Sequence, residues 1–181
     1  HNTKRHLNEY TSLDFEMGYI DSFEEIMAME TGFLQYAMNL LKTEYAKEVQ
    51  ILKLDIPDVS KIPAVRFDVA VTHYPSKKRP FYAMDDPEDA RFTLSFDLLF
   101  KGLEITTGGQ RIHDYNMLVQ KIEDRGMTQE GMEQYLDTFK HGMPPHGGLG
   151  IGLERLTMQL IGEENVRETC LFPRDMNRLE P

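Results

Sequence analysis

The stretch "GGLGIGLERLTMQLIG", Gly147 to Gly162, places glycine at positions 148, 150 and 152 and then a charged pair, Glu154 and Arg155, ahead of an apolar run. Glycine-rich phosphate loops wrap a turn and need a different spacing, G-x-G-x-x-G or the Walker pattern. In an extended strand, side chains two residues apart lie on the same face. The three glycines therefore predict a strand face without side chains, which allows a flat group to approach the backbone.

Two interpretations of this strand stay open at this point. In the first, the glycines let the strand pack closely on a neighbouring helix. In the second, the bare face is the floor for an aromatic ring, and the guanidinium of Arg155 covers the ring from the other side. Arginine stacks well on ring faces, so the second interpretation predicts a site for a purine.

The stretch "SFDLLFKGLEITTGGQR" is the second candidate region. A two-residue hairpin turn is expected at Lys101 and Gly102. With that turn, Asp97 pairs with Thr106 and lies on the same sheet face as Glu104. The backbones of Asp97 and Glu104, as diagonal neighbours, would be about 7–8 Å apart. Two carboxylates at this distance repel each other unless a cation lies between them, and magnesium is usually held by one or two carboxylates plus phosphate oxygens. The alternative is two acids on a solvated sheet face.

Composition narrows the class of protein. The chain has 181 residues, of which 40% are hydrophobic, enough for one domain with a core. Its net charge of −10 argues against a domain that grips nucleic acid through a broad basic surface, although "PSKKRP" at 75–80 is a local basic patch. A single cysteine excludes an internal disulfide and fits a reducing cytoplasm. No apolar run approaches the roughly 20 residues of a membrane span.

Periodicity predicts an α+β fold with an antiparallel sheet flanked by helices. Ser22 and Glu25 have the spacing of a capping box at the start of a long helix. In the preceding strand, Asp14 and Glu16 alternate with apolar residues and form an acidic face. Strands are expected at 11–20, 64–71, 80–84, 91–100, 103–109 and 147–152, and helices at 22–45, at 113–126, at 128–142 and from 154 onward.

Taken together, these stretches resemble the class II aminoacyl-tRNA synthetases. "GGLGIGLERL" is similar to their motif 3, and "RHLNEYTSLDFEM" to the second half of their motif 2. "YPSKKRPFYAM", "FDLLFKGLEITTGGQRIH" and "FKHGMPPHGGLGIGLERL" are similar to aspartyl-tRNA synthetases of the archaeal and eukaryotic type, and nearly the whole chain is covered. The likeness extends to the archaeal-type enzymes of some bacteria, several of which charge both tRNA(Asp) and tRNA(Asn).

The resemblance implies a two-step reaction in the cytoplasm, carried out by a homodimer in the full-length protein. ATP and aspartate would form aspartyl-adenylate with the help of magnesium, and the aspartyl group would then pass to tRNA(Asp), with tRNA(Asn) as an alternative second acceptor. No side chain need act as an acid or base, because positioning and electrostatic stabilisation suffice for in-line attack at the α-phosphorus.

The resemblance also assigns residues. It assigns ATP binding to Arg5, His6, Leu7, Glu104, Gly152, Leu153, Glu154 and Arg155, with Arg5 and Arg155 as the catalytic arginines. It assigns aspartate binding to Ser76, Arg79, Thr107 and Arg111, and magnesium binding to Asp97, Glu104 and Thr107. Thr107 stands where many members of the family have serine, so the hydroxyl is kept. Arg79 stands where lysine is common, so the charge is kept but the geometry of its hydrogen bonds changes.

The sequence differs from the family pattern because several of the family's segments are missing from it. Residues 1–181 are interpreted as an incomplete catalytic core, without motif 1, the start of motif 2 with its arginine, and the anticodon-binding domain. An internal segment of a few tens of residues is expected to be missing near 69–72. We therefore expect the chain as written not to aminoacylate tRNA.

Three alternatives to the aspartyl enzyme stay open. An asparaginyl-tRNA synthetase would differ in one buried contact, and Arg79 with Arg111 favours an anionic side chain over a neutral amide. A synthetase-like paralogue would make free asparagine from aspartate and ATP. A non-catalytic relic would serve only to bind tRNA or protein.

Overall fold

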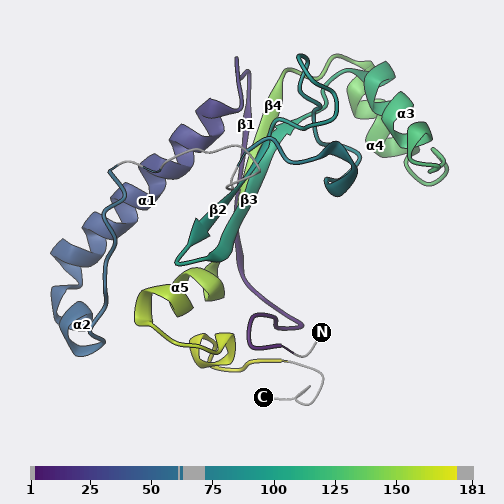
Figure 1. The fold of residues 1–181 in the computed structure, drawn as a ribbon. Coiled ribbons are helices and arrows are strands. Elements are labelled where there is room, and N and C mark those ends of the chain that lie inside the picture. Colours follow the sequence, from purple (N-terminus) through teal and green to yellow (C-terminus); the bar gives the residue numbers. More distant parts are fainter. Residues whose placement is uncertain (1–2, 61, 63–71, 175–181) are drawn as a thin grey trace.

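A four-stranded antiparallel sheet forms the centre of the molecule in a computed structural model, which describes residues 3–60, 62 and 72–174 (Figure 1). The strand order is β1-β4-β3-β2. The strands are β1 (Ser12–Gly18), β2 (Ser95–Phe100), β3 (Leu103–Arg111) and β4 (His146–Gly152). The predicted α+β class with an antiparallel sheet is confirmed.

The glycine strand β4 lies between β1 and β3. Leu149 and Ile151 are buried and belong to the main core, together with residues of the long helix α1 (Glu24–Glu44). Gly148 and Gly150 point the other way and pair with Glu16 and Asp14 of β1. The sheet therefore has one apolar face against α1 and one face with glycine and acidic side chains.

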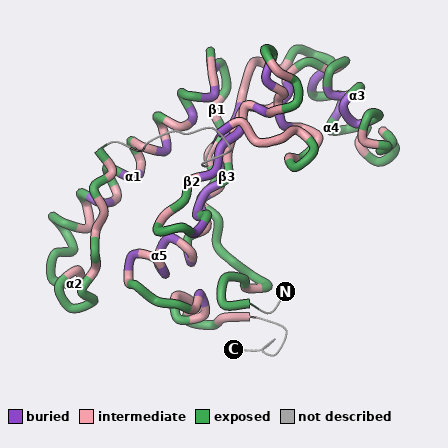
Figure 2. Tube along the Cα trace, in the orientation of Figure 1, coloured by how far each residue is buried: buried purple, intermediate pink, exposed green. Residues whose placement is uncertain are grey.

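The remaining helices lie toward the ends of the sheet. Figure 1 shows α3 (Tyr115–Asp124) and α4 (Glu133–Lys140) together at one end, and α5 (Leu153–Ile161) at the other. The short helix α2 (Ala46–Ile51) continues α1, and two 3₁₀ turns, η1 (Ser76–Lys78) and η2 (Val166–Thr169), complete the described elements. Figure 2 shows buried positions along β2, β3 and β4 and on one side of α1.

The start of α1 differs from the prediction. The helix begins at Glu24 with Phe23 as its N-cap, so the assignment of Ser22 as N-cap is wrong. Half of the capping box is nevertheless formed, because the Glu25 carboxylate accepts hydrogen bonds from the backbone N–H groups of Asp21, at 2.6 Å, and Ser22, at 3.1 Å. The acidic side chain therefore satisfies the amide groups of the two residues just before the N-cap.

A β-bulge changes the predicted register of the β2–β3 hairpin. The pairing shifts between Leu98 and Leu99, so that Asp97 pairs with Thr107 rather than with Thr106. The extra residue turns Thr106 into the core, where it is 1% exposed, and leaves Thr107 on the open face. The Thr107 hydroxyl donates to Glu104 Oε1 at 3.3 Å, so Asp97 and Glu104 still belong to one face, as predicted.

Other expected strands are shorter than predicted. Segment 80–84 makes only an isolated bridge, at Ala83, and the strand expected at 91–100 begins at Ser95. The strand expected at 64–71 lies outside the described residues. The helices expected at 113–126 and 128–142 are confirmed with shorter bounds, and the final helix begins one residue before Glu154.

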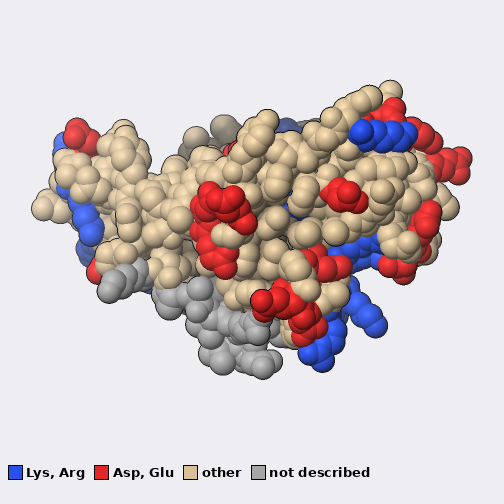
Figure 3. Space-filling view, turned by 90° about the horizontal axis from the view of Figure 1, so that it is seen from above, with Lys and Arg blue, Asp and Glu red and all other residues tan. Residues whose placement is uncertain are grey.

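Surface charge and helix length bear on possible partners. On the face shown in Figure 3, acidic and basic side chains lie in separate small groups rather than in one continuous basic surface. Within the described part of the chain, every helix is too short or too polar to cross a bilayer.

Candidate functional site

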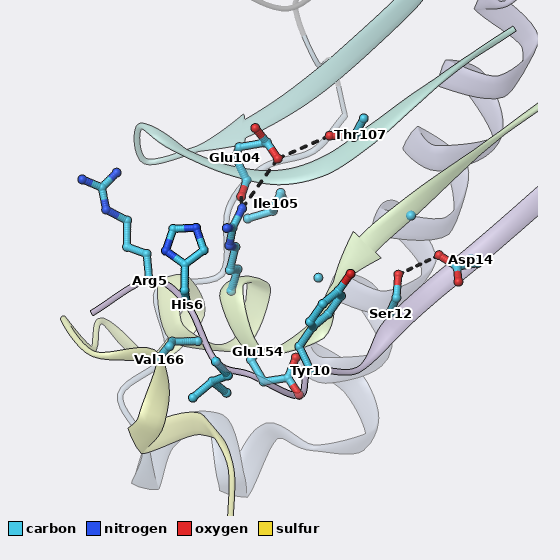
Figure 4. Close-up of a pocket in the computed structure, with 14 residues that line it drawn as sticks. Arg5, His6, Tyr10, Ser12, Asp14, Glu104, Ile105, Thr107, Glu154 and Val166 are labelled. Atoms are coloured by element: carbon cyan, nitrogen blue, oxygen red, sulfur yellow. Dashed lines mark hydrogen bonds and ion pairs between the residues drawn. The ribbon is translucent and has the colours of Figure 1, made fainter. Parts of the chain in front are cut away.

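A cavity of about 490 Å³ lies over the end of the glycine strand. In Figure 4, Arg5 and His6 stand on one side of it, Glu104 lies above, and Tyr10 and Ser12 lie on the other side. The cavity brings together every predicted ATP-binding residue except Leu153, namely Arg5, His6, Leu7, Glu104, Gly152, Glu154 and Arg155. These residues come from the N-terminal loop, β3, β4 and α5, so only the tertiary fold assembles them.

The glycines of β4 have different surroundings. A Cβ on Gly147 would lie 2.3 Å from Ile26 Cδ1, so this glycine allows close packing on α1. A Cβ on Gly150 would lie 2.7 Å from Asp14 Oδ1, because that side chain leans across the strand. At Gly152 the nearest atom would be 3.7 Å away, so the floor of the cavity is open there.

Arg155 is held at the cavity by β3. Its Nη1 donates to the backbone carbonyl of Glu104 at 3.0 Å and lies 3.6 Å from the Glu104 carboxylate. The Arg155 side chain is 26% exposed, and that of Glu104 is 48% exposed. A cation and an anion thus face the same cavity within reach of a bound ligand.

Glu154 has a partner within the protein. Its carboxylate accepts two hydrogen bonds, at 2.9 and 3.0 Å, from the backbone N–H of Thr11, and the residue is 8% exposed. Thr11 directly precedes β1 and follows the loop that carries Arg5 and His6. Glu154 therefore fixes the end of this loop against α5.

A second cavity, of about 360 Å³, adjoins the first. The two share Asp14, Thr107 and Gly150 in their linings. Arg79 and Arg111, which were predicted to bind aspartate, both line the second cavity. Ser76, which was assigned the same role, is absent from the lining of either described cavity.

Arg79 is fixed by three neighbours. Its Nη2 lies 2.6 Å from Asp97 Oδ1, its Nε donates to Ser95 Oγ at 3.1 Å, and its guanidinium lies 3.9 Å from the ring centre of Tyr74. Burial raises the pKa of Tyr74 to about 12, and the negative charge of Asp97 adds to the shift. The hydroxyl of Tyr74 is therefore neutral over the physiological pH range.

Arg111 is engaged on both sides. It forms an ion pair with Glu16 of β1, and its guanidinium lies 4.9 Å from the ring centre of Tyr82. The side chain is 33% exposed. A ligand carboxylate would have to take the place of the Glu16 carboxylate to bind Arg111 bidentately.

The predicted metal ligands divide into two groups. Glu104 and Thr107 line the first cavity, whereas Asp97 lines neither cavity and is paired with Arg79. Among residues 3–60, 62 and 72–174, no cluster of three or more His, Cys, Asp or Glu side chains has the geometry of a metal site. Glu104 with its neighbouring hydroxyl suits a magnesium ion that takes its other ligands from phosphate and water.

Several lining residues were not assigned a role from the sequence. Alternation in the sequence predicted that Asp14 and Glu16 lie on the same face of β1. The pairing of β1 with β4 places them beside Gly150 and Gly148, so that this face borders the cavities. Tyr82 carried no local signal, because its contact with Arg111 depends on how segment 80–84 meets β3.

Comparison with known proteins gives consistent matches. Residues 1–176 match the family described as tRNA synthetases class II (D, K and N). The chain is 40% identical to the aspartate–tRNA(Asp/Asn) ligase of Deinococcus radiodurans and 36% identical to that of Aeropyrum pernix. Both alignments cover the whole of this chain, but only 52% of the first protein and 50% of the second. It thus spans about half the length of the curated relatives it matches.

Solved structures match over the whole chain as well. The asparaginyl-tRNA synthetase of Entamoeba histolytica in complex with asparaginyl-adenylate gives a TM-score of 0.87 at 27% identity, with 100% of this chain and 51% of that chain covered. The aspartyl-tRNA synthetase of the same organism gives a TM-score of 0.82 at 28% identity, with 100% of this chain and 46% of that chain covered.

Proposed function

Because the chain belongs to the class II tRNA synthetases of the D, K and N group, we propose that it is the catalytic portion of an aspartate–tRNA ligase. The protein would activate aspartate with ATP to form aspartyl-adenylate and then transfer the aspartyl group to tRNA(Asp). The names and identities of the curated relatives support aspartate as the amino acid, and two of them also support tRNA(Asn) as a second acceptor.

The observation that carries this proposal is the junction of the two cavities. The first holds cations and an open glycine floor, which suit a nucleotide, and the second holds Arg79 and Arg111, which suit an anionic amino acid. They meet at Asp14, Thr107 and Gly150. The α-phosphate of ATP and the α-carboxylate of aspartate would meet at this junction, as adenylate formation requires.

The chain's own groups would act by binding and orienting. In the first cavity, the purine would lie on the floor at Gly152 beside Arg155, and Arg5 and His6 would contact the phosphates. Fixed donors and cations aimed at developing charge can supply several kcal/mol of transition-state stabilisation. Holding both reactants in line removes a further entropic part of the barrier.

Magnesium would be held by Glu104 and the Thr107 hydroxyl, together with phosphate oxygens. When bound, the ion would neutralise charge on the phosphates of ATP. The assignment of Asp97 as a direct ligand has less support, because its carboxylate neutralises Arg79 in the buried wall.

Recognition of aspartate would depend on charge. Arg111 would exchange its contact with Glu16 for the side-chain carboxylate of the substrate, while Arg79 stays fixed beside it. A neutral amide would replace the Glu16 carboxylate at Arg111 with a weaker, uncharged acceptor, which disfavours asparagine. The solved asparaginyl enzymes share the fold, so the choice depends on these contacts rather than on architecture.

The wider properties of the protein are also proposals. We propose that the full-length protein is a cytoplasmic homodimer that uses tRNA as its second substrate, and that residues 1–181 carry only its catalytic core. An internal segment near 69–72 would be absent relative to the relatives; the alignment with the Deinococcus radiodurans protein, which runs over 226 positions for 181 residues, supports this.

Aspartate-dependent exchange of pyrophosphate into ATP, measured on the full-length protein, tests the activity. The wild type should exchange with aspartate and magnesium, and Arg155→Ala should lose at least tenfold in rate, whereas the exposed Arg91→Ala should match the wild type. Exchange with asparagine alone would indicate the asparaginyl enzyme. Free asparagine as product would indicate the paralogue, and the absence of both exchange and magnesium-dependent ATP binding would indicate the relic.

A further inference from the structure

Arg125, at the C-terminal end of α3, reaches back to a segment almost fifty residues earlier. Its Nη2 donates to the backbone carbonyl of Ser76 at 2.6 Å and its Nη1 to that of Arg79 at 2.5 Å. These carbonyls lie at the start of η1 and directly after it. A planar guanidinium that satisfies two carbonyls at once fixes their relative orientation, which a single-point cation does not.

Lys121 makes a second contact from the same face of α3, one turn earlier. Its Nζ donates to the backbone carbonyl of Ala83 at 2.7 Å and lies 2.5 Å from Asp85 Oδ1. The residue is 8% exposed, and burial lowers its pKa while Asp85 opposes the shift. A buried cation of this kind needs these acceptors, so the contact resists displacement.

The backbone between the two contacts forms a wall of the second cavity. Arg79, Pro80, Tyr82 and Ala83 all line it. Near its end the segment is tied to β3 by an isolated bridge at Ala83, and residues 76–81 belong to no described strand. The carbonyl contacts from α3 restrain this backbone in addition to backbone hydrogen bonds, among them those from Ser76 N–H to the Arg91 carbonyl and from Met84 N–H to the Gln110 carbonyl.

We propose that Arg125 and Lys121 are positioning residues that set the amino-acid pocket by holding segment 76–85 against α3. Arg125 acts through the backbone of Arg79, and Lys121 acts through that of Ala83. Neither side chain lines the described cavities, so their effect on the substrate is indirect. This inference rests on the proposed function for its substrate, although the restraint itself does not.

The same bonds also add to stability, and the experiment must separate the two effects. A structural role alone would lower the fraction of active protein and hence kcat, without changing the KM of the folded fraction. A positioning role should raise KM for aspartate and leave KM for ATP unchanged, because no residue of segment 76–85 lines the first cavity. Displacement of a substrate-binding group by about 1 Å can change catalysis by up to about 100-fold.

The kinetic test compares variants of the full-length protein by aspartate-dependent pyrophosphate exchange at saturating ATP. Arg125→Ala should raise KM for aspartate about tenfold, and Arg125→Lys should give an intermediate value because one donor replaces the fork. Gln120→Ala, an exposed change on α3, is the matched control and should behave as the wild type. Unchanged KM for aspartate in Arg125→Ala, with only kcat lowered, would overturn the proposal.

Hydrogen exchange of the backbone amides in 76–86 provides a readout that does not need activity. Arg125→Ala should accelerate exchange in this segment and leave the β1–β4 pairing protected. If the wild type shows no aspartate-dependent reaction, the proposed function fails, while faster exchange in the variant still supports the restraint. Exchange in 76–86 equal to that of the wild type would refute the restraint itself.

Discussion

The guanidinium of Arg79 lies 2.6 Å from the carboxylate of Asp97, and the two side chains are only 11% and 7% exposed. Sequence reasoning assigned these residues to different tasks, one to the amino acid and the other to a metal. In the fold each is the other's counter-ion. The pair forms part of the wall behind the second cavity, so its integrity affects both stability and recognition.

Replacement of Asp97 tests how much the ion pair between Arg79 and Asp97 contributes to the stability of the fold. Asp97→Asn leaves a largely buried guanidinium without its counter-charge, and we expect a loss of about 3 kcal/mol in the free energy of unfolding. Urea denaturation measures the change. Arg91→Ala breaks an ion pair in which the arginine side chain is 82% exposed and should change stability by less than about 1 kcal/mol. Equal effects of the two changes would contradict the assignment.

The buried carboxyl of Glu30 predicts a pH dependence of stability. Glu30, on α1, is 4% exposed, and burial raises its pKa from 4.5 to about 7. Folding therefore favours the protonated form. The stability that this provides is fully present below pH 4.5 and is lost as the pH rises through about 7, by about 3 kcal/mol in total.

Glu30→Gln, which keeps the size but removes the titration, is the matched variant. It should equal the wild type near pH 4.5 and exceed it at pH 8 by up to about 3 kcal/mol. Denaturation curves of both proteins at the two pH values measure this. A difference between them that does not vary with pH would show that Glu30 keeps an ordinary pKa in the fold.

The glycines of β4 should respond differently to alanine. Gly147→Ala places a methyl group 2.3 Å from Ile26 Cδ1 and 2.5 Å from the Gly109 carbonyl, and overpacking of this kind destabilises by about 1–3 kcal/mol. Gly152→Ala meets no atom closer than 3.7 Å and should be neutral for stability within about 0.5 kcal/mol.

Gly152→Ala should instead weaken ATP binding, because its methyl group projects into the first cavity. We expect about a tenfold loss, equivalent to about 1.4 kcal/mol. Calorimetric titration with ATP and magnesium measures it, with thermal unfolding of the same sample as the stability control. Unchanged affinity would show that the purine does not rest on this part of the strand.

Glu154 should affect both stability and ATP binding, because it holds the end of the N-terminal loop in place. Glu154→Gln keeps the shape, but the single Thr11 N–H, now shared between two carboxylate oxygens, would donate to a neutral amide oxygen instead, with an expected loss of about 1 kcal/mol. The loop with Arg5 and His6 should then bind ATP less tightly. Glu163→Gln, an exposed change just after α5, is the comparison. A normal ATP affinity in Glu154→Gln would separate the loop from nucleotide binding.

Local patterns in the sequence were sufficient for much of the fold. Alternation predicted β1 and the bare face of β4, and the Lys101–Gly102 turn is confirmed, with positive φ angles of 49° and 77°. Most of the predicted ATP-binding residues come together in one cavity. These predictions succeeded because strand alternation and turn chemistry act between residues close in the chain.

The sequence by itself determined the four strands of the sheet, though not all their bounds, the long helices and, through the resemblance, the cations that face the two cavities. Only the tertiary structure decided the bulge that exchanges Thr106 for Thr107, the pairing of Arg79 with Asp97, and the contact of Arg125 with two carbonyls. For the two arginines, the physical reason is that their contacts join segments 18 to 49 residues apart in the chain, and a backbone carbonyl is present at every residue. Such an acceptor leaves no pattern in the sequence, so its partner is known only when the chain has folded.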